Sequence, residues 1–155
     1  MSAVQTSYSE RIALGLPGQV ASESTHDIDS RTVETAAGIG FGCAVTKGTA
    51  DKGIVLGGAV AGFAGVAVRD ATVRPTDTDE YAQYDDAGVL MRGDIFVTTK
   101  NIVAAGGDVY YDSTTGLWDD AASGNVGPVK GAVWVTSAAA AAIAVLRLTG
   151  SQHDN

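Results

Sequence analysis

The stretch FAGVAVRDATVRPTDTDEYAQYDDAGVLMRGDIFVTT, from Phe63 to Thr99, decides the fold class of this chain. Its first part predicts a strand, because β-branched residues recur at Val66, Val68 and Val73. A polar, acidic connection follows at residues 77–80. The apolar strand pattern then resumes around a turn expected at Gly93-Asp94, in Val89, Met91, Ile95 and Val97. The stretch thus predicts strand, acidic turn and strand, and it holds no set of residues that could run a reaction.

The same pattern continues from Ser30 to Leu148. About seven to nine short strands, with turn signals roughly every 8–12 residues, predict an all-β fold, either a jelly-roll-like sandwich or a small barrel. The segment from Ser137 to Leu148 is ambiguous, because its alanines favour a helix. We expect a loop for the first alanines and a strand for Ala142 to Leu148, paired with residues 132–135 as a terminal hairpin. A short helix is the alternative.

Three segments make up the expected domain organisation: an extended arm over residues 1–29, a β-domain over 30–150 and a polar tail over 151–155. The arm has no sustained period, and its Gly-Pro-Gly stretch around Pro17 breaks any helix or strand. It nevertheless carries apolar residues, which a disordered tail lacks, including Leu14, Leu16 and Val20. The arm therefore lies either on a neighbouring subunit or along the edge of its own domain.

The composition excludes several classes of partner. The formal net charge is −8, and the ten lysines and arginines are scattered singly, which argues against binding to a nucleic-acid backbone. Charged residues make up 18% of the chain, against about 25% in typical domains. A surface poor in charge fits a self-association or partner interface, or simply a glycine-rich sheet fold.

The sequence contains no run of about 18 consecutive apolar residues, so no membrane-spanning helix is predicted. The start of the chain does not resemble a secretory signal. We therefore expect the protein in a cytosol or in a particle assembled there.

Residues that could carry chemistry are few and poorly placed for it. Cys43 is the only cysteine, which excludes an intrachain disulfide, and its apolar context predicts a small core residue. The acidic stretch at residues 77–80 lacks the glycine and the distal glutamate of a calcium-binding loop, so a solvated turn is the better interpretation. Asp85-Asp86 and Asp119-Asp120 are interpreted as turn acids. The glycines of residues 38–42 lack the dinucleotide-binding spacing and predict a bulge or close packing.

No catalytic triad can be built from neighbours in sequence, although Ser24, His26 and Asp27 lie close together. The sequence therefore predicts no catalytic residue, no cofactor and no metal. The large aromatic residues of the C-terminal half are Tyr110, Trp118 and Trp134. Acidic rather than basic residues surround them, so they are interpreted as core residues or protein–protein anchors and not as a platform for nucleic-acid bases.

Six segments, in order, resemble one known family over nearly the whole chain: GLPGQVAS, DIDSRTVETAAGIGFGCAV, FAGVAVRDAT, EYAQYDDAGVLMRGDIFV, GGDVYYDSTTG and GAVWVTSAAAAAIAVLRL. The chain is similar to the cement, or decoration, proteins on the capsids of tailed bacteriophages. That resemblance implies a jelly-roll-like β-domain on the outside of an icosahedral shell. It also implies small symmetric oligomers across capsomer junctions, which lock the shell against the pressure of the DNA inside, and no catalysis.

The resemblance makes the major capsid protein the expected partner and the virion exterior the expected location. It favours a homo-oligomer, with a dimer preferred over a trimer. The residues expected at the capsid interface or the self-interface are Leu14, Leu16, Pro17, Val20 and Trp118.

Two functions of other classes stay open at this stage. One is a carbohydrate-binding β-sandwich, for which Trp118 beside Asp119 and Asp120 is the only candidate and would have to be exposed. The other is a β-fold hydrolase, which requires several carboxylates to converge on one cleft. The carboxylates in question are Asp70, Asp77, Asp79 and Asp108.

Overall fold

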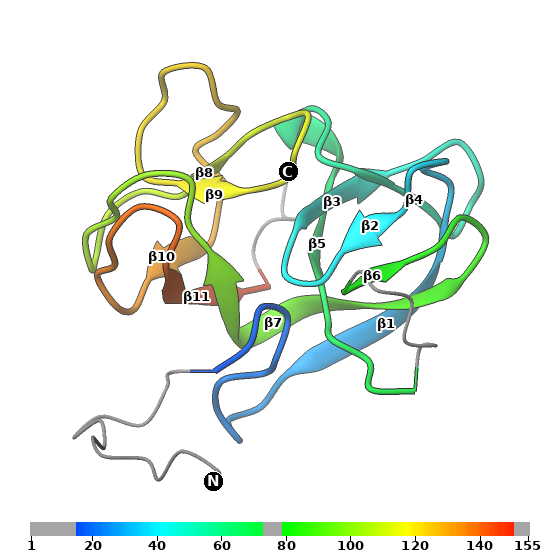
Figure 1. Cartoon of the computed structure of the whole chain (residues 1–155), viewed down its shortest axis with the longest axis horizontal. Coiled ribbons are helices and arrows are strands. Elements are labelled where there is room, and N and C mark those ends of the chain that lie inside the picture. Colours follow the sequence, from blue (N-terminus) through cyan, green and yellow to red (C-terminus); the bar gives the residue numbers. More distant parts are fainter. Residues whose placement is uncertain (1–14, 73–78, 151–155) are drawn as a thin grey trace, which may run out of the picture.

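The computed structural model describes residues 15–72 and 79–150 (Figure 1). Within these ranges the chain forms β-strands, with no α-helix and a single turn of 3-10 helix, η1 (Val60–Gly62). The strands are β1 (Asp27–Val33), β2 (Ile39–Gly40), β3 (Ala44–Lys47), β4 (Gly53–Leu56), β5 (Phe63–Ala67), β6 (Glu80–Tyr81), β7 (Asp86–Thr98), β8 (Tyr110–Tyr111), β9 (Trp118–Asp119), β10 (Ala132–Trp134) and β11 (Ile143–Thr149). The expected all-β class is confirmed, and β1 begins before Ser30. The described chain has no helix long and apolar enough to cross a membrane.

A small closed barrel forms one half of the molecule. The main sheet has the order β1-β4-β3-β5-β7-β11-β10, and β1 also pairs with β7, so that the first five strands of this order close into a ring. β1 pairs with β4 in parallel, while the other pairs of this sheet are antiparallel. Of the two predicted architectures, the structure shows the small barrel. β10 and β11 extend the sheet beyond the barrel (Figure 1).

The longest strand, β7, belongs to both halves. Its first part pairs with β1 and β5, and its second part pairs with β11. The turn predicted at Gly93-Asp94 is therefore wrong, because these residues lie inside one continuous strand. Gly93 has a φ of 127°, and a Cβ there would lie 2.8 Å from the Cβ of His26. Gly93 thus marks the point where β7 changes its pairing partners. The chain does not reverse its direction there, as the predicted turn would require.

The C-terminal hairpin forms as predicted. β10 and β11 pair antiparallel, with Ala132 opposite Leu148 and Trp134 opposite Leu146. The alanines of residues 138–141 form bridges and turns and not the alternative helix. The pattern of side chains along β11 explains why a strand forms here and not a helix. A strand places Ala144, Leu146 and Leu148 on one face, where they are buried.

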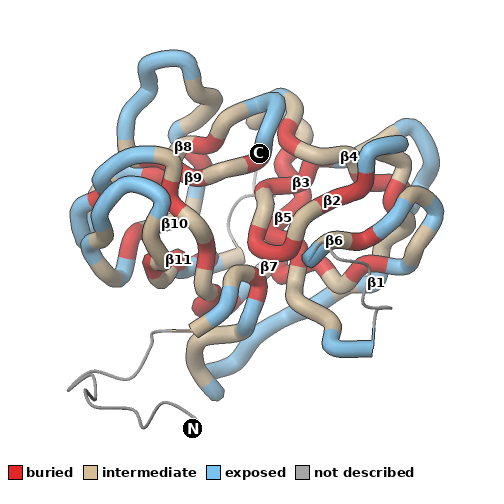
Figure 2. Tube along the Cα trace, in the orientation of Figure 1, coloured by how far each residue is buried: buried red, intermediate tan, exposed pale blue. Residues whose placement is uncertain are grey.

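Two clusters of buried side chains form the core. Figure 2 marks the positions of the buried residues along the chain. The larger cluster contains both tryptophans and includes Phe63 and Tyr111, whose ring centres lie 6.0 and 5.7 Å, respectively, from that of Trp118. The smaller cluster fills the barrel around Ile39, Val45 and Tyr81. Cys43 packs against this second cluster and is partly buried, and burial raises the pKa of its thiol to about 11. The thiol is therefore inert at neutral pH.

Candidate functional site

Residues 15–22 of the arm run beside the second part of β7. The N–H of Gly18 donates to the carbonyl of Phe96 at 2.8 Å, and the N–H of Phe96 donates to the carbonyl of Gln19 at 2.9 Å. The N–H of Ala21 donates to the carbonyl of Asp94 at 2.8 Å. These residues therefore lie on their own domain, which is one of the two arrangements the sequence left open. Leu14 lies outside the described residues.

The Gly-Pro-Gly stretch is a packing element. Gly18 has a φ of +80°, and a Cβ there would lie 2.8 Å from the backbone nitrogen of Arg69 and 2.9 Å from that of Gly42. Arg69 holds the same stretch through its N–H to the carbonyl of Gly18 at 2.7 Å and through Nε to the carbonyl of Pro17 at 3.1 Å. The predicted close packing of the glycines around residue 42 is thus confirmed at Gly42.

Arg69 joins this contact to the acidic connection that follows β5. Its guanidinium lies 4.9 Å from the centre of the Phe41 ring and donates to the carboxylate of Asp79 at 2.7 Å. The hydrogen bond from Arg69 holds the pKa of Asp79 below its usual range. Val73, Asp77 and the rest of this connection lie outside the described residues.

The predicted interface residues of the arm differ in exposure. Leu16 is 54% exposed, Pro17 and Val20 are half-buried, and Val20 forms an isolated bridge with Ile95. Leu16 is therefore the described arm residue whose side chain is most available to a partner. Exposed large apolar side chains also occur elsewhere on the described surface, at Ile28, Tyr84, Ile102 and Val135.

Trp118 is not a surface residue, and its prediction as an interface residue is wrong. The side chain is 0% exposed, and its indole Nε1 donates to the carbonyl of Gly42 at 2.7 Å. A ring of this size that buries all of its surface and satisfies its one donor belongs to the core. The carbohydrate-binding interpretation required this ring to be exposed, so it loses its only aromatic candidate.

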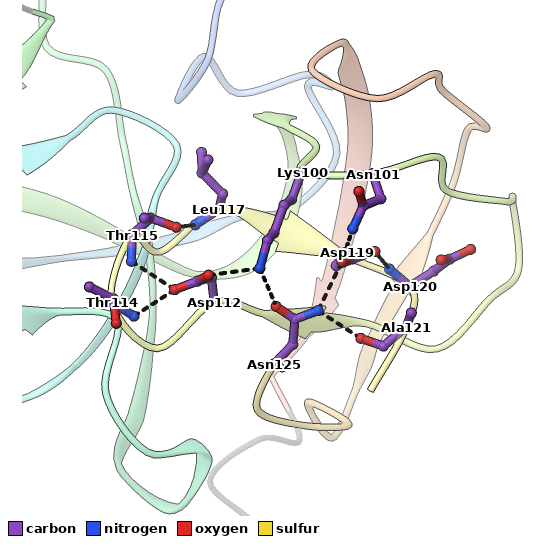
Figure 3. Close-up of polar contacts among 10 residues, drawn as sticks. All are labelled: Lys100, Asn101, Asp112, Thr114, Thr115, Leu117, Asp119, Asp120, Ala121 and Asn125. Atoms are coloured by element: carbon purple, nitrogen blue, oxygen red, sulfur yellow. Dashed lines mark hydrogen bonds and ion pairs between the residues drawn. The ribbon is translucent and has the colours of Figure 1, made fainter. Parts of the chain in front are cut away.

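A polar network that sequence reasoning missed includes Asp119, which follows Trp118 in the chain (Figure 3). The ammonium of Lys100 donates to Asp112 at 2.8 Å and to the amide oxygen of Asn125 at 3.2 Å. The amide of Asn125 in turn donates to Asp119 at 2.8 Å, and the amide of Asn101 donates to the same carboxylate oxygen at 2.7 Å. The network ties three separate segments together.

Asp119 corrects a further prediction, because it is not a turn acid but a fully buried residue of β9. Asp112, by contrast, caps a turn: its Oδ1 accepts the N–H groups of Thr114 and Thr115 at 2.8 and 3.0 Å. The hydrogen bond from Lys100, followed by those from Thr114 and Thr115, lowers the pKa of Asp112 to about 2. The stretch Asp-Ser-Thr-Thr-Gly at residues 112–116 is a signal that could have predicted this cap.

Of the carboxylates named for a hydrolase, Asp77 lies outside the described residues. Asp70 accepts from the N–H and the hydroxyl of Thr72, and Asp79 is paired with Arg69. No group of three histidine, cysteine, aspartate or glutamate side chains within residues 15–72 and 79–150 could hold a metal ion.

A groove of about 340 Å³ lies where the arm meets β7 and β11. Arg147 on its wall donates from Nε and Nη2 to the nearly buried carboxylate of Asp94 at 2.7 and 2.9 Å. Arg147 and Asp94 lie opposite each other on β11 and β7, so this bidentate ion pair links the two strands.

Comparison with known proteins places the chain in a family. The model of the family described as structural cement protein (E217 gp24/Pam3 gp6) matches residues 4–149. The chain therefore belongs to the structural cement proteins of bacteriophages. It is a capsid cement, or decoration, protein, it associates with the phage capsid, and its location is the virion.

Solved structures of phage particles have the same fold. A chain in the capsid of Myoviridae phage XM1 superposes with a TM-score of 0.71 at 20% identity, covering 96% of this chain and 98% of the other. The N-terminal base of head fiber gp8.5 of bacteriophage phi29 superposes with a TM-score of 0.53 at 12% identity, covering 81% of this chain and 96% of the other. No curated protein matches the chain.

Proposed function

We propose that the protein binds the outer surface of an icosahedral shell across the junctions between capsomers, with the major capsid protein as its partner. The observation that carries this proposal is the match of the cement-protein family to residues 4–149. The fold is compatible with the task, because a clamp requires a rigid body and the small barrel and the β10–β11 hairpin share one long strand. Many copies on one shell would act together, so that each copy needs only a modest affinity.

The proposal includes self-association and the absence of catalysis. A homo-oligomer, with a two-fold dimer preferred over a trimer, follows from the low charge density and from the apolar residues of the arm. The network of Lys100, Asp112 and Asp119 uses its acids for capping and pairing, so we propose no hydrolytic activity and no metal requirement. The net charge of −8 is unfavourable for binding to nucleic acid.

The first experiment adds purified protein to shells that lack it. Electron cryomicroscopy should show the protein on the outside, at positions that bridge capsomers, and the decorated shells should resist heating better than bare shells. Density inside the shell, or occupancy confined to capsomer centres, would contradict the proposal. Light scattering of the free protein at micromolar concentration tests for the oligomer. A monomeric mass in solution, together with single separate copies on the shell, would contradict self-association.

Two truncations test the arm. Removal of residues 1–14, which include Leu14, should weaken binding to shells and leave the melting temperature of the free protein nearly unchanged. Removal of residues 1–21 should also lower the melting temperature, because it strips the hydrogen bonds of Gly18, Gln19 and Ala21 from β7. If shells bind the protein that lacks residues 1–14 with unchanged affinity, the prediction that Leu14 lies at the interface is wrong.

A further inference from the structure

A second groove lies at the end of the barrel, far from the arm. It encloses about 430 Å³ and is formed by the end of β1, the β3–β4 turn and the β6–β7 turn, with Thr32, Glu34, Thr49, Ala50, Gln83 and Tyr84 as its lining. These turns lie together at the right-hand end of the molecule in Figure 1. The contacts proposed above for the arm do not involve these turns.

Tyr84 stands out at the rim of the groove. Its side chain is 75% exposed, and its φ is 70°, which is unusual for a residue other than glycine. Its N–H donates to the carbonyl of Val33 at 2.8 Å, and the neighbouring Gln83 donates from its amide to the carbonyl of Glu34 at 3.1 Å. The backbone is thus fixed on both sides, and the ring is held outward as a rigid aromatic anchor of the kind that dominates interfaces.

Glu34 supplies a fixed charge in the same groove. Its Oε2 accepts the N–H and the hydroxyl of Thr49 at 2.9 and 3.0 Å, and its Oε1 accepts the N–H of Ala50 at 2.8 Å. The hydrogen bonds from Thr49 and Ala50 hold the pKa of Glu34 below its usual value, so the group is ionised at neutral pH. A carboxylate offers about four acceptor positions, so these three bonds leave room for one more donor.

The turn is built around this carboxylate. A Cβ at Gly48 would lie 2.4 Å from one carboxylate oxygen of Glu34, and a Cβ at Gly53 would lie 1.8 Å from the other. Both glycines therefore leave space for the side chain of Glu34, whose carboxylate is held in this position by the turn. A preorganised group loses little conformational entropy when a partner arrives.

The charge around the groove is negative. Asp51 and Asp85 follow two of its lining residues directly in the chain. Two nearby cations, Arg31 and Lys52, both bind Asp29, at 2.8 and 3.6 Å, while Lys47 is an exposed cation at the end of β3. A cation that enters this groove would meet the carboxylate of Glu34 and the side chain of Tyr84, which both line it, and these two groups suit arginine or lysine.

We propose that this groove, with Tyr84 and Glu34 at its centre, receives a loop of the major capsid protein that presents an arginine or lysine side chain. The inference rests on the proposed function and adds to it a second contact, on a different part of the surface from residues 15–22 of the arm. Two separate contacts fit a protein that bridges neighbouring capsomers, since each contact can engage a different one.

Charge and ring are tested separately by shell-binding measurements on the full-length protein. Tyr84→Gly removes the ring and relieves the left-handed backbone, so the protein should fold at least as well as the wild type and bind shells about 30-fold more weakly or worse. Ala50→Lys should weaken binding about 10-fold by repelling the incoming cation. Binding by the wild type should also weaken as salt is raised.

Matched controls lie at the other end of the molecule. Ile102→Ala removes an apolar side chain that is 71% exposed, and Ala122→Lys makes the same change of charge on the β9–β10 loop. Both should bind shells like the wild type. If the Tyr84 and Ala50 variants also bind like the wild type, the groove is not the contact, while the proposed function stands. If the wild type fails to decorate shells, the proposed function itself fails. Unchanged shell binding together with Tyr84-dependent binding to a glycan array would replace the capsid loop by a carbohydrate.

Discussion

Trp118 contributes to stability through packing and through one hydrogen bond to Gly42. Trp118→Ala should lower the free energy of unfolding by about 3–5 kcal/mol, because it leaves a large cavity in the main core cluster. Trp118→Phe should cost less, since most of the packing stays and only the hydrogen bond is lost. Denaturant titration of both variants measures this. A cost below that of the exposed Ile102→Ala would mean that the ring is not in the core.

Asp112 makes stability depend on pH. Its pKa is lowered to about 2, first by the hydrogen bond from Lys100, so its contribution to stability is complete above the ordinary aspartate pKa and is lost as pH falls toward 2. Asp112→Asn should therefore cost about 1.5–3 kcal/mol at pH 7. The gap between wild type and variant should close between pH 4 and pH 2. Melting temperatures across this range test it, and a gap that is constant with pH would contradict the assignment.

Single residues show where sequence reasoning reached its limit. The types of Cys43, Trp118 and Trp134 identify them as candidates for the core, and their burial agrees with this. Asp119 has the type of a surface residue, and only the fold reveals that two asparagine amides and a backbone N–H satisfy it in the interior. Pairing between distant segments is a property of the topology, which no local pattern encodes.

Gly93 is the critical residue of the longest strand. Gly93→Ala would place a Cβ 2.8 Å from His26 at a φ of 127°. Gly106 offers a matched control, because its φ is also positive, at 80°, and nothing lies within 4 Å of a Cβ there. We expect Gly93→Ala to lower the free energy of unfolding by more than the roughly 1 kcal/mol that backbone strain alone costs at Gly106. Equal losses in thermal melts would remove the steric argument.

Elements were predicted well where alternation and turn residues agree. The β10–β11 hairpin shows this, because apolar alternation in residues 143–148 outweighed the helix preference of the alanines before it. The sequence failed at Gly93-Asp94, where a dipeptide that normally marks a turn allows a strand to change partners. The arm was ambiguous for the same reason, since the pairing of Val20 with Ile95 depends on a partner 75 residues away.

The whole described domain should unfold as one unit. β7 contributes Leu90 and Ile95 to one core cluster and Ala87 and Val89 to the other, so neither cluster can open without disturbing the strand between them. Both tryptophans lie in the larger cluster, so their fluorescence reports on that half, while far-ultraviolet circular dichroism reports on all strands. The two probes should give coincident transitions. Separate midpoints would show that the barrel and the β10–β11 half are independent.

The side-by-side run of the arm and β7 also has a mechanical meaning. The bonds of Gly18, Gln19 and Ala21 cross from one strand to the other at right angles to both. A pull on the arm along the strand axis loads these bonds together, in shear, whereas a pull away from the sheet peels them one at a time. Resistance to force is governed by the barrier to rupture and not by equilibrium stability. An arm gripped by a neighbour on an expanding shell would therefore pass tension directly into the longest strand of the molecule.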